Sequence, residues 1–426
     1  MVKIKIISIA FGWIFSHSLI AQTDTLTIQY CYEAAEKLSP LKKQELLNQE
    51  IYELSFENHG TSYLPKLTLN GKLTYQSDVF AIPGSTMIGD FPVIPKEQYQ
   101  VSLNLQQNIY DGGIAKFSKV MEDSRLQMNQ KSLETQLYKI IEQINTLYFS
   151  YLQLQESEKI LQTSLDNLHN QRKTIEASVN FGVILKSNLF NIDKQILTIE
   201  QDIISIQSDQ NAIAQILALW IGKPIGVEVF FSIPDEPNVE KNMKIVRPEL
   251  ELFDSQKKVL ESQKGINNIE KLPRFWVFAQ GGIGRPNPLN FFEIEHATFY
   301  LIGLQMNWQI FDWGKVNRSK QIYQTQQEIV NTQEADFKRN INMALSKQFI
   351  DIEKLKKIID KDKEIIKLQD QVVRTSFSEL NNGVITATEY LTELNALTQA
   401  KIKKALHELE LSKTYISIYT TTGNEL

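Results

Sequence analysis

Cysteine is almost absent from this sequence of 426 residues, and Cys31 is the only one. A single cysteine excludes an internal disulfide framework. The five histidines are scattered, and none forms the His-x-x-x-His pair that marks many metal sites. No nucleotide-binding glycine loop, nucleophile elbow or cysteine pair occurs either. The sequence therefore predicts no catalytic site, no cofactor and no metal, and we do not expect an enzyme.

A basic surface and long apolar runs are also lacking. The net charge is −5 and 22% of the residues are charged, so the basic footprint of a nucleic-acid-binding protein is missing. After the N-terminus no run of about 18 apolar residues occurs, so no transmembrane α-helix is predicted. Transmembrane β-strands give a much weaker signal, segments of about ten alternating residues, and stay possible.

The first 21 residues have the pattern of a secretory signal peptide. Lys3 and Lys5 give a positive start, residues 6–15 are largely apolar, and Leu19-Ile20-Ala21 offers a small-residue cleavage site. A short buried helix is the alternative. We expect residues 1–21 to direct export of the chain.

What the sequence does contain is a duplication. Asp111-Gly112-Gly113 returns as Asp312-Trp313-Gly314, and Asn180-Phe181-Gly182-Val183-Ile184 returns as Asn381-Asn382-Gly383-Val384-Ile385, both 201 residues later. Upstream, Pro65 matches Pro273 at an offset of 208. A period of about 200 residues is too long for a solenoid repeat, so we infer a duplicated, domain-sized unit.

Each copy has one very long stretch without glycine or proline, residues 114–181 and 315–382. Apolar residues recur there at coiled-coil spacing, which predicts long helices. Gly182 or Gly383 then separates each stretch from a shorter run of the same kind, which indicates the reversal of an antiparallel helical hairpin. Short amphipathic helices at 40–62 and 248–272 would supply the length that the shorter arms lack.

Between the short and long helices the apolar period changes to two. Alternation covers residues 66–75, 98–109 and 300–310, with a further strand near 275–283. Aromatic residues gather at the strand ends: Tyr63, Tyr75, Tyr110, Trp276, Phe299, Phe311 and Trp313. Strands of about ten residues with one apolar face and aromatic ends suit a tilted bilayer crossing. A soluble β-sandwich is the alternative.

Four strands are too few to close a barrel, because the smallest transmembrane barrels have eight. An open sheet edge in lipid leaves backbone groups unsatisfied at several kcal/mol each. The chain must therefore contribute its strands to a shared barrel, and three protomers would give twelve strands around a lumen. The predicted fold is mixed α and transmembrane β, with a trimeric 12-strand barrel continued by a long α-helical coiled-coil periplasmic tunnel. The pattern requires an oligomer, whereas the number three is only permitted.

These features divide the chain into eight segments. They are a signal peptide (1–21), an N-terminal periplasmic helix (22–62), barrel β-hairpin 1 (63–110), periplasmic helical hairpin 1 (111–222), a linker (223–247), a short periplasmic helix (248–272), barrel β-hairpin 2 (273–312) and periplasmic helical hairpin 2 (313–426).

Taken together, these residues resemble the TolC-like family of bacterial outer-membrane efflux proteins. The likeness lies in Leu64-Pro65-Lys66-Leu67, in Ile109-Tyr110-Asp111-Gly112-Gly113 and its copy Ile310-Phe311-Asp312-Trp313-Gly314, in Arg247-Pro248-Glu249-Leu250, and in the two glycine tips. The resemblance implies a homotrimer in outer-membrane lipid that extends into the periplasm. It also implies a periplasmic adaptor (membrane fusion) protein, an inner-membrane transporter of the RND or ABC type, and a passive conduit for exported substrates.

Two groups of residues are candidate sites. The adaptor-docking candidates are the tips, Phe181, Gly182, Val183, Ile184, Asn382, Gly383, Val384 and Ile385; simple hairpin closure is the alternative. The gate candidates are Glu389, Glu393 and Asn188. Glu389 and Glu393 stand four residues apart on one helical face, and symmetry would make them a ring of carboxylates.

Two other functions fit part of the pattern. One is the exit duct of a type I protein secretion system, because the partners decide the cargo. The other is a secreted structural coiled-coil protein with adhesive β-hairpins. That interpretation explains the long helices but neither the matched arm lengths nor the aromatic-ended strands.

Overall fold

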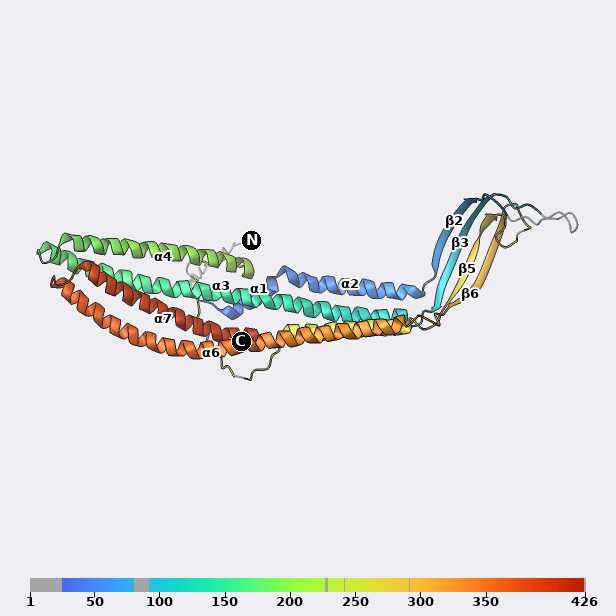
Figure 1. Ribbon diagram of the computed structural model, residues 1–426. Helices are drawn as coiled ribbons and strands as arrows, with labels where there is room; N and C mark the ends of the chain where they lie inside the picture. Colours follow the sequence, from blue (N-terminus) through green and yellow to red (C-terminus); the bar gives the residue numbers. More distant parts are fainter. Residues whose placement is uncertain (1–24, 80–91, 227–228, 241, 291, 425–426) are drawn as a thin grey trace, which may run out of the picture. The chain divides into compact units, whose positions relative to one another are not determined.

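The computed structural model describes residues 25–79, 92–226, 229–240, 242–290 and 292–424, so the expected signal peptide at 1–21 lies outside the described residues. Helices dominate and strands are few (Figure 1). The chain forms two compact units, each assembled from three separate segments. Unit 1 is the chain up to Ala35, Ile144–Glu236 and Leu355–Lys413; unit 2 is Glu36–Gln143, Pro237–Lys354 and the chain from Thr414.

The helical elements repeat in length. The long helices α3 (Ile114–Asn180) and α6 (Lys315–Asn381) have 67 residues each, and α4 (Lys186–Ile221) and α7 (Ala387–Thr422) have 36 each. This equality confirms the duplicated helical hairpins. No helix in the described ranges is both long enough and apolar enough to cross a membrane.

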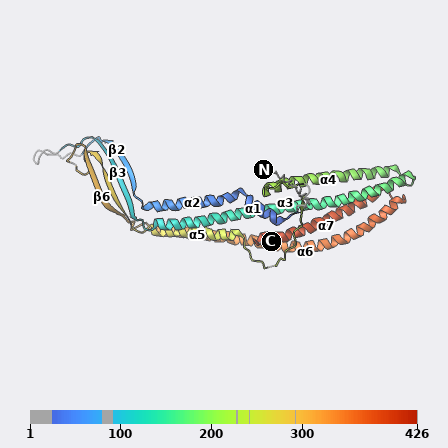
Figure 2. The ribbon, with the colours of Figure 1, turned by 180° about the vertical axis from the view of Figure 1, so that it is seen from behind.

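Unit 1 has a heptad-patterned core between its four main helices. In both views α4 lies alongside α3, and α7 lies alongside α6 (Figures 1 and 2). The buried residues follow the 3-4 spacing of a coiled coil, Leu161, Leu165, Leu168 and Ile175 on α3 and Ile192, Ile196, Ile199 and Ile203 on α4, joined by Val373 and Leu380 of α6 and Tyr390, Leu394 and Leu397 of α7. Burying each such aliphatic side chain stabilises the unit by about 1.5–3 kcal/mol.

Both hairpin reversals use the same backbone motif. Gly182 has φ 73° and Gly383 has φ 71°, left-handed values that suit glycine. The next amide, Val183 N, donates to Ser178 O at 2.9 Å, and Val384 N donates to Glu379 O at 2.9 Å. These six-residue closures are Schellman motifs, so the prediction of a glycine reversal is confirmed.

The sheet of unit 2 has four antiparallel strands in the order β2-β3-β5-β6. Their bounds are β2 (Lys66–Tyr75), β3 (Glu97–Tyr110), β5 (Arg274–Arg285) and β6 (Ala297–Asn307). The expectation that alternation at 300–310 forms one strand was wrong at its end. Because β5 begins at Arg274, which pairs with Asn307, Trp308 and Ile310 have no strand to pair with.

Each repeat turns from strand to helix around an aspartate. Asp111 Oδ1 accepts from Gly113 N and Oδ2 from Ala115 N, both at 2.8 Å, and the Tyr63 hydroxyl donates to Oδ1 at 2.7 Å. Asp312 accepts from Gly314 N and Val316 N in the same way, both at 2.9 Å. The carboxylates satisfy amides that a helix start leaves open, which explains the Asp-Gly motif.

The segments expected as one N-terminal helix (22–62) and as a linker (223–247) hold additional structure. β1 (Thr25–Leu26) pairs in parallel with β4 (Phe230–Phe231) in unit 1. The Tyr148 hydroxyl, fully buried, lies 2.7 Å from both Leu26 O and Ser232 O. The helical part is divided into α1 (Ile28–Leu38) and α2 (Lys43–Gly60), because Ser39 and Pro40 start a 3-10 turn between them. The single-helix expectation was therefore wrong.

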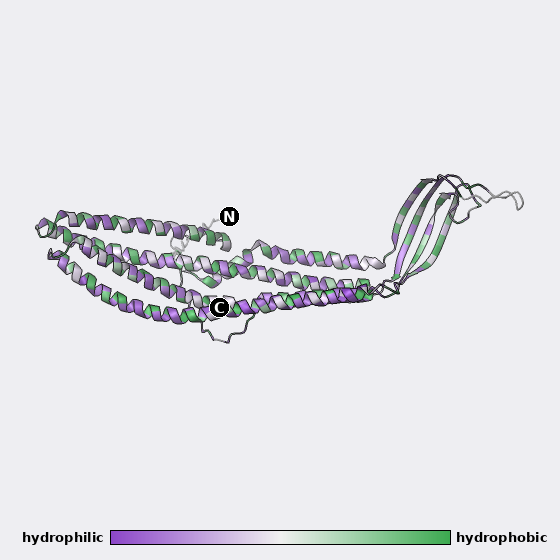
Figure 3. Cartoon of the chain, viewed as in Figure 1, coloured by the Kyte–Doolittle hydropathy of each residue, from purple (hydrophilic) through white to green (hydrophobic). Residues whose placement is uncertain are grey.

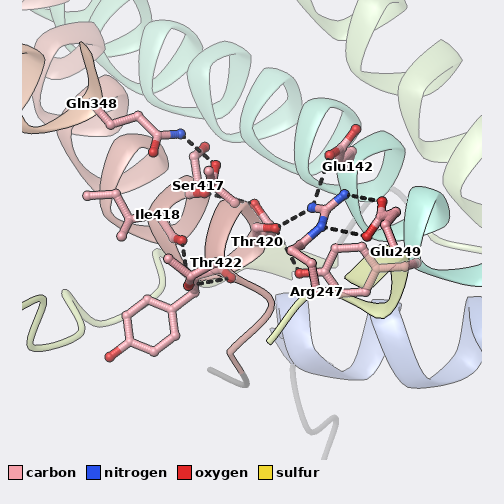
Figure 4. Close-up of polar contacts among 11 residues, drawn as sticks. Glu142, Arg247, Glu249, Gln348, Ser417, Ile418, Thr420 and Thr422 are labelled. Atoms are coloured by element: carbon pink, nitrogen blue, oxygen red, sulfur yellow. Dashed lines mark hydrogen bonds and ion pairs between the residues drawn. The ribbon is translucent and has the colours of Figure 1, made fainter. Parts of the chain in front are cut away.

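Arg247, where the second repeat opens, forms a buried polar junction in unit 2 (Figure 4). The Arg247 guanidinium binds Glu249 through two nitrogens, with Nη2 2.6 Å from Oε1 and Nε 3.0 Å from Oε2. Its Nη1 donates to Thr420 O near the end of α7 at 2.6 Å, and its face lies 4.4 Å from the Tyr138 ring centroid. Arg247 thus ties the start of α5 (Pro248–Ile269) to α3 and α7.

Gly423 allows this junction to close. Its φ is 86°, and an added Cβ would lie 2.7 Å from Arg247 N. Val246 N donates to Thr422 O at 2.7 Å in the same place. The chain after α7 therefore lies directly on the backbone that precedes α5. Only glycine permits this approach.

Candidate functional site

The helical tips of unit 1 divide into exposed and buried apolar residues. Phe181, Val183 and Val384 are 84%, 53% and 71% exposed. Ile184 is only 8% exposed, and Ile385 packs against the same core. Of the apolar docking candidates, Ile184 and Ile385 thus anchor the turns, while the other three present their side chains to solvent.

The two tips contact each other. A Cβ on Gly383 would lie 3.2 Å from Val183 O, whereas a Cβ on Gly182 would have open space around it. Asn382 Nδ2 donates back to Ser378 O at 2.8 Å and so closes its own helix end. The tips therefore form one apolar and polar surface rather than two separate ends.

The helices that follow the tips start in different ways. At α7 the Thr386 and Glu389 side chains form a capping box: Glu389 Oε2 accepts from Thr386 N at 2.7 Å, and Glu389 N donates to Thr386 Oγ1 at 3.3 Å. At α4 the N-cap is Leu185, which makes no capping bond, and Lys186 follows it. Lys186 Nζ lies 5.6 Å from the Phe190 ring centroid. The first tip is therefore apolar and basic.

All three gate candidates have partners within this unit. The hydrogen bonds from Thr386 hold the pKa of Glu389 below its usual value. Glu393 Oε2 accepts from Gln369 Nε2 of α6 at 2.7 Å, and Asn188 Oδ1 accepts from Ala387 N at 2.9 Å. Glu389 and Glu393 do not bind each other; each is held by a different neighbour.

A polar ladder between α4 and α7 was not predicted from the sequence. Asn191 Nδ2 donates to Thr388 Oγ1 at 3.3 Å, and the Gln195 and Asn395 amides pair reciprocally at 3.2 and 3.4 Å. With Asn188 they connect the two hairpins along one side. Among the described residues no group of His, Cys, Asp and Glu is arranged to hold a metal ion.

No family model and no curated protein matches this sequence. Solved structures do match. VceC, an outer membrane protein of Vibrio cholerae, is 14% identical with a TM-score of 0.63, over 93% of this chain and 96% of its own. The CmeC outer membrane channel of Campylobacter jejuni is 13% identical with a TM-score of 0.64, over 93% and 85%. The open-state MtrE outer membrane channel of Neisseria gonorrhoeae is 16% identical with a TM-score of 0.63, over 93% and 89%.

The chain has the TolC-like outer-membrane channel fold. This confirms, at the level of fold, the resemblance seen in the Asp-Gly turns and the glycine tips. The two tips lie together in unit 1. The spacing of Glu389 and Glu393 on one helical face had suggested a ring of carboxylates formed by symmetry. Gln369, the partner of Glu393, could be found only with the two helices in place, whereas the pairing of Thr386 with Glu389 has a capping signature in the sequence.

Proposed function

We propose that this protein is an outer-membrane channel that extends into the periplasm and assembles as a homotrimer. The observation that carries the proposal is the four-stranded sheet, whose outer strands β2 and β6 each pair on one side only within the described residues. Apolar and polar residues alternate along the strands (Figure 3). The apolar side chains of one face are open, with Leu73 81% and Tyr300 79% exposed. Three such sheets would close a twelve-strand barrel and remove every open edge.

In this proposal the helices of the three copies form a periplasmic tunnel, and the tips of unit 1 bind a periplasmic adaptor. An inner-membrane transporter of the RND or ABC type supplies the energy, and this chain is a passive conduit in a tripartite efflux system. The exposed Phe181, Val183 and Val384 support the docking role, because covering apolar side chains with a partner stabilises the complex.

The decisive experiment follows the full-length chain with its own N-terminus in a Gram-negative host. We expect it in detergent-extracted outer membrane, as an oligomer of about three subunit masses that dissociates on heating before electrophoresis. The purified oligomer should form ion-conducting pores in planar bilayers. A soluble, monomeric product without pores would contradict the proposal.

Replacing Phe181 and Val183 together with serine is expected to weaken adaptor capture about tenfold or more, since each fully buried apolar side chain contributes about 1.5–3 kcal/mol. The measurement is chemical cross-linking in the native cell, quantified as the adaptor band relative to total channel. Leu219→Ser, which alters a residue of α4 that is as exposed as Phe181, is the matched control and should leave the band unchanged. Equal loss in the control would mean that the tips have no special role.

Two substitutions of Glu389 separate a gate from a helix cap. Glutamine keeps a side chain that can close the capping box with Thr386 but removes the charge, whereas alanine removes both. If Glu389 forms a carboxylate ring that holds the tunnel closed, both variants raise single-channel conductance in planar bilayers. If it only caps α7, Glu389→Gln conducts like the wild type.

A further inference from the structure

The second face of the sheet has an unusual charge. Strand pairing places the even-numbered residues of β2, β3 and β5 on one face with the odd-numbered residues of β6; for example, Asn104 pairs with Gln280, which pairs with Leu301. Three cations lie on this face: Lys66, Lys72 and Arg274. The only carboxylate in the four strands is Glu97, and it pairs with Tyr75 on the opposite, apolar face.

These cations have no counter-charge nearby. Within the described ranges, Lys66, Lys72 and Arg274 make no ion pair with a carboxylate. Glu293, in the loop beyond β5, is bound instead by Asn287, whose Nδ2 lies 2.6 Å from Oε2. The remaining polar residues of the face are amides and hydroxyls, such as Gln280, whose Nε2 donates to Ser102 Oγ at 3.1 Å. The face as a whole is therefore positive.

The same face carries an apolar patch on β5 and β6. Its accessible members are Trp276, Phe278 and Leu301, and Phe299 lies on the same face but is only 7% exposed. The Phe278 ring lies across Gly303, where an added Cβ would meet it at 2.8 Å, and Phe299 pairs with Gly282. Aromatic rings placed over glycines stabilise strands, so strand stability is a sufficient reason for the aromatic residues of this face. It does not account for unpaired cations on the same face.

We propose that this face lines the conduit and makes it selective for anions, favouring small organic anions with an aromatic or apolar body. The inference rests on the proposed channel function, since three copies would place nine of these cations around one lumen. Rings of lysine and arginine select anions in pores, and a lumen with low-dielectric walls concentrates the field of such charges. The aromatic patch would receive the apolar body while the cations attract the acid group.

The test is the chloride-to-potassium permeability ratio of the full channel in planar bilayers, measured under a potassium chloride gradient. The wild type should give a ratio above one, and Lys66→Glu with Lys72→Glu should lower it about threefold or more. The control is Lys96→Glu, at a loop lysine that donates to Ser77 O at 3.0 Å and lies outside the strands; it should change the ratio much less.

A second measurement addresses the organic part of the substrate. Added 1-naphthoate should reduce the chloride current of the wild type, and Leu301→Ser or Phe278→Ser should weaken that block about threefold or more. Heat-sensitive migration of each variant as an oligomer confirms that it folds. Absence of any pore would contradict the channel function itself. A chloride-to-potassium permeability ratio that stays the same when Lys66 and Lys72 are replaced would overturn the anion proposal. An unchanged naphthoate block in the Leu301 and Phe278 variants would overturn its aromatic part.

Discussion

Arg247→Leu is expected to destabilise unit 2 by about 3–5 kcal/mol, because removing one partner leaves a buried opposite charge uncompensated. Burial works against the charged guanidinium, but the hydrogen bonds and charge of Glu249 outweigh it and raise the pKa of Arg247. Leucine would leave Glu249 nearly enclosed without its partner, and Thr420 O would lose the guanidinium but keep the Tyr138 hydroxyl as a donor. The contacts that would remain between the end of α7 and the segment before α5 include Val246 N with Thr422 O at 2.7 Å and Asn424 Nδ2 with Lys244 O at 3.0 Å.

Thermal unfolding of the detergent-solubilised protein measures this effect. Arg125→Leu is the matched control, since Arg125 pairs with Glu122 from a half-exposed position and such pairs contribute about 0–1 kcal/mol. Arg247→Lys should fall between the two, because lysine keeps the charge but not the two-pronged geometry. If Arg247→Leu melts within a degree or two of the control, the junction is not what joins α5 to α7.

Asp111→Ala is expected to cost about 2–3 kcal/mol, and Asp312→Ala about 1 kcal/mol. Both lose two helix-capping bonds. Asp111 is buried and also accepts from the Tyr63 hydroxyl, which would lose its partner, whereas Asp312 is only partly buried. The two repeats thus provide a controlled comparison within one protein, measured by urea or thermal unfolding. Equal losses in the two variants would exclude a special role for Tyr63.

The Asp111 carboxylate should also make the stability of the protein depend on pH. Burial opposes ionisation of Asp111, but the hydrogen bonds from Ala115 N, Tyr63 and Gly113 N prevail and lower its pKa. A lowered folded-state pKa adds stability that is complete above the unfolded-state value of about 3.9 and disappears as pH falls through the folded value. Between neutral pH and about pH 3 the wild type should therefore lose more stability than Asp111→Ala. Parallel losses would show that Asp111 does not contribute to the acid sensitivity.

Local signals in the sequence were enough for the two long helices. Stretches without glycine or proline and with heptad spacing predicted α3 and α6 to within a residue, because helical hydrogen bonds join neighbours in the chain. The two-residue strands β1 and β4 carry no period, and they pair across about 200 residues. No local rule could place them. The same limit applied to β6, whose end is determined by where β5 begins.

Site residues needed the tertiary structure for a related reason. Glu393 lies near Gln369, and Asn188 near Ala387, only after two helical hairpins pack together. The alternation of β2 correctly placed Lys66 and Lys72 on its polar side. Their alignment with Arg274 on one positive face depends on the register of β3 against β5, which no single strand reveals.

The outer edges of β2 and β6, which are unpaired among the residues that the structure describes, also bear on how the protein matures. Unit 1 buries its own apolar core within one chain, so it can fold in water soon after secretion. Until other copies bind, the sheet exposes two backbone edges and an apolar face. Such open edges promote aggregation. Under the proposed trimeric assembly, newly exported chains should therefore depend on periplasmic chaperones until their sheets pair with those of other copies.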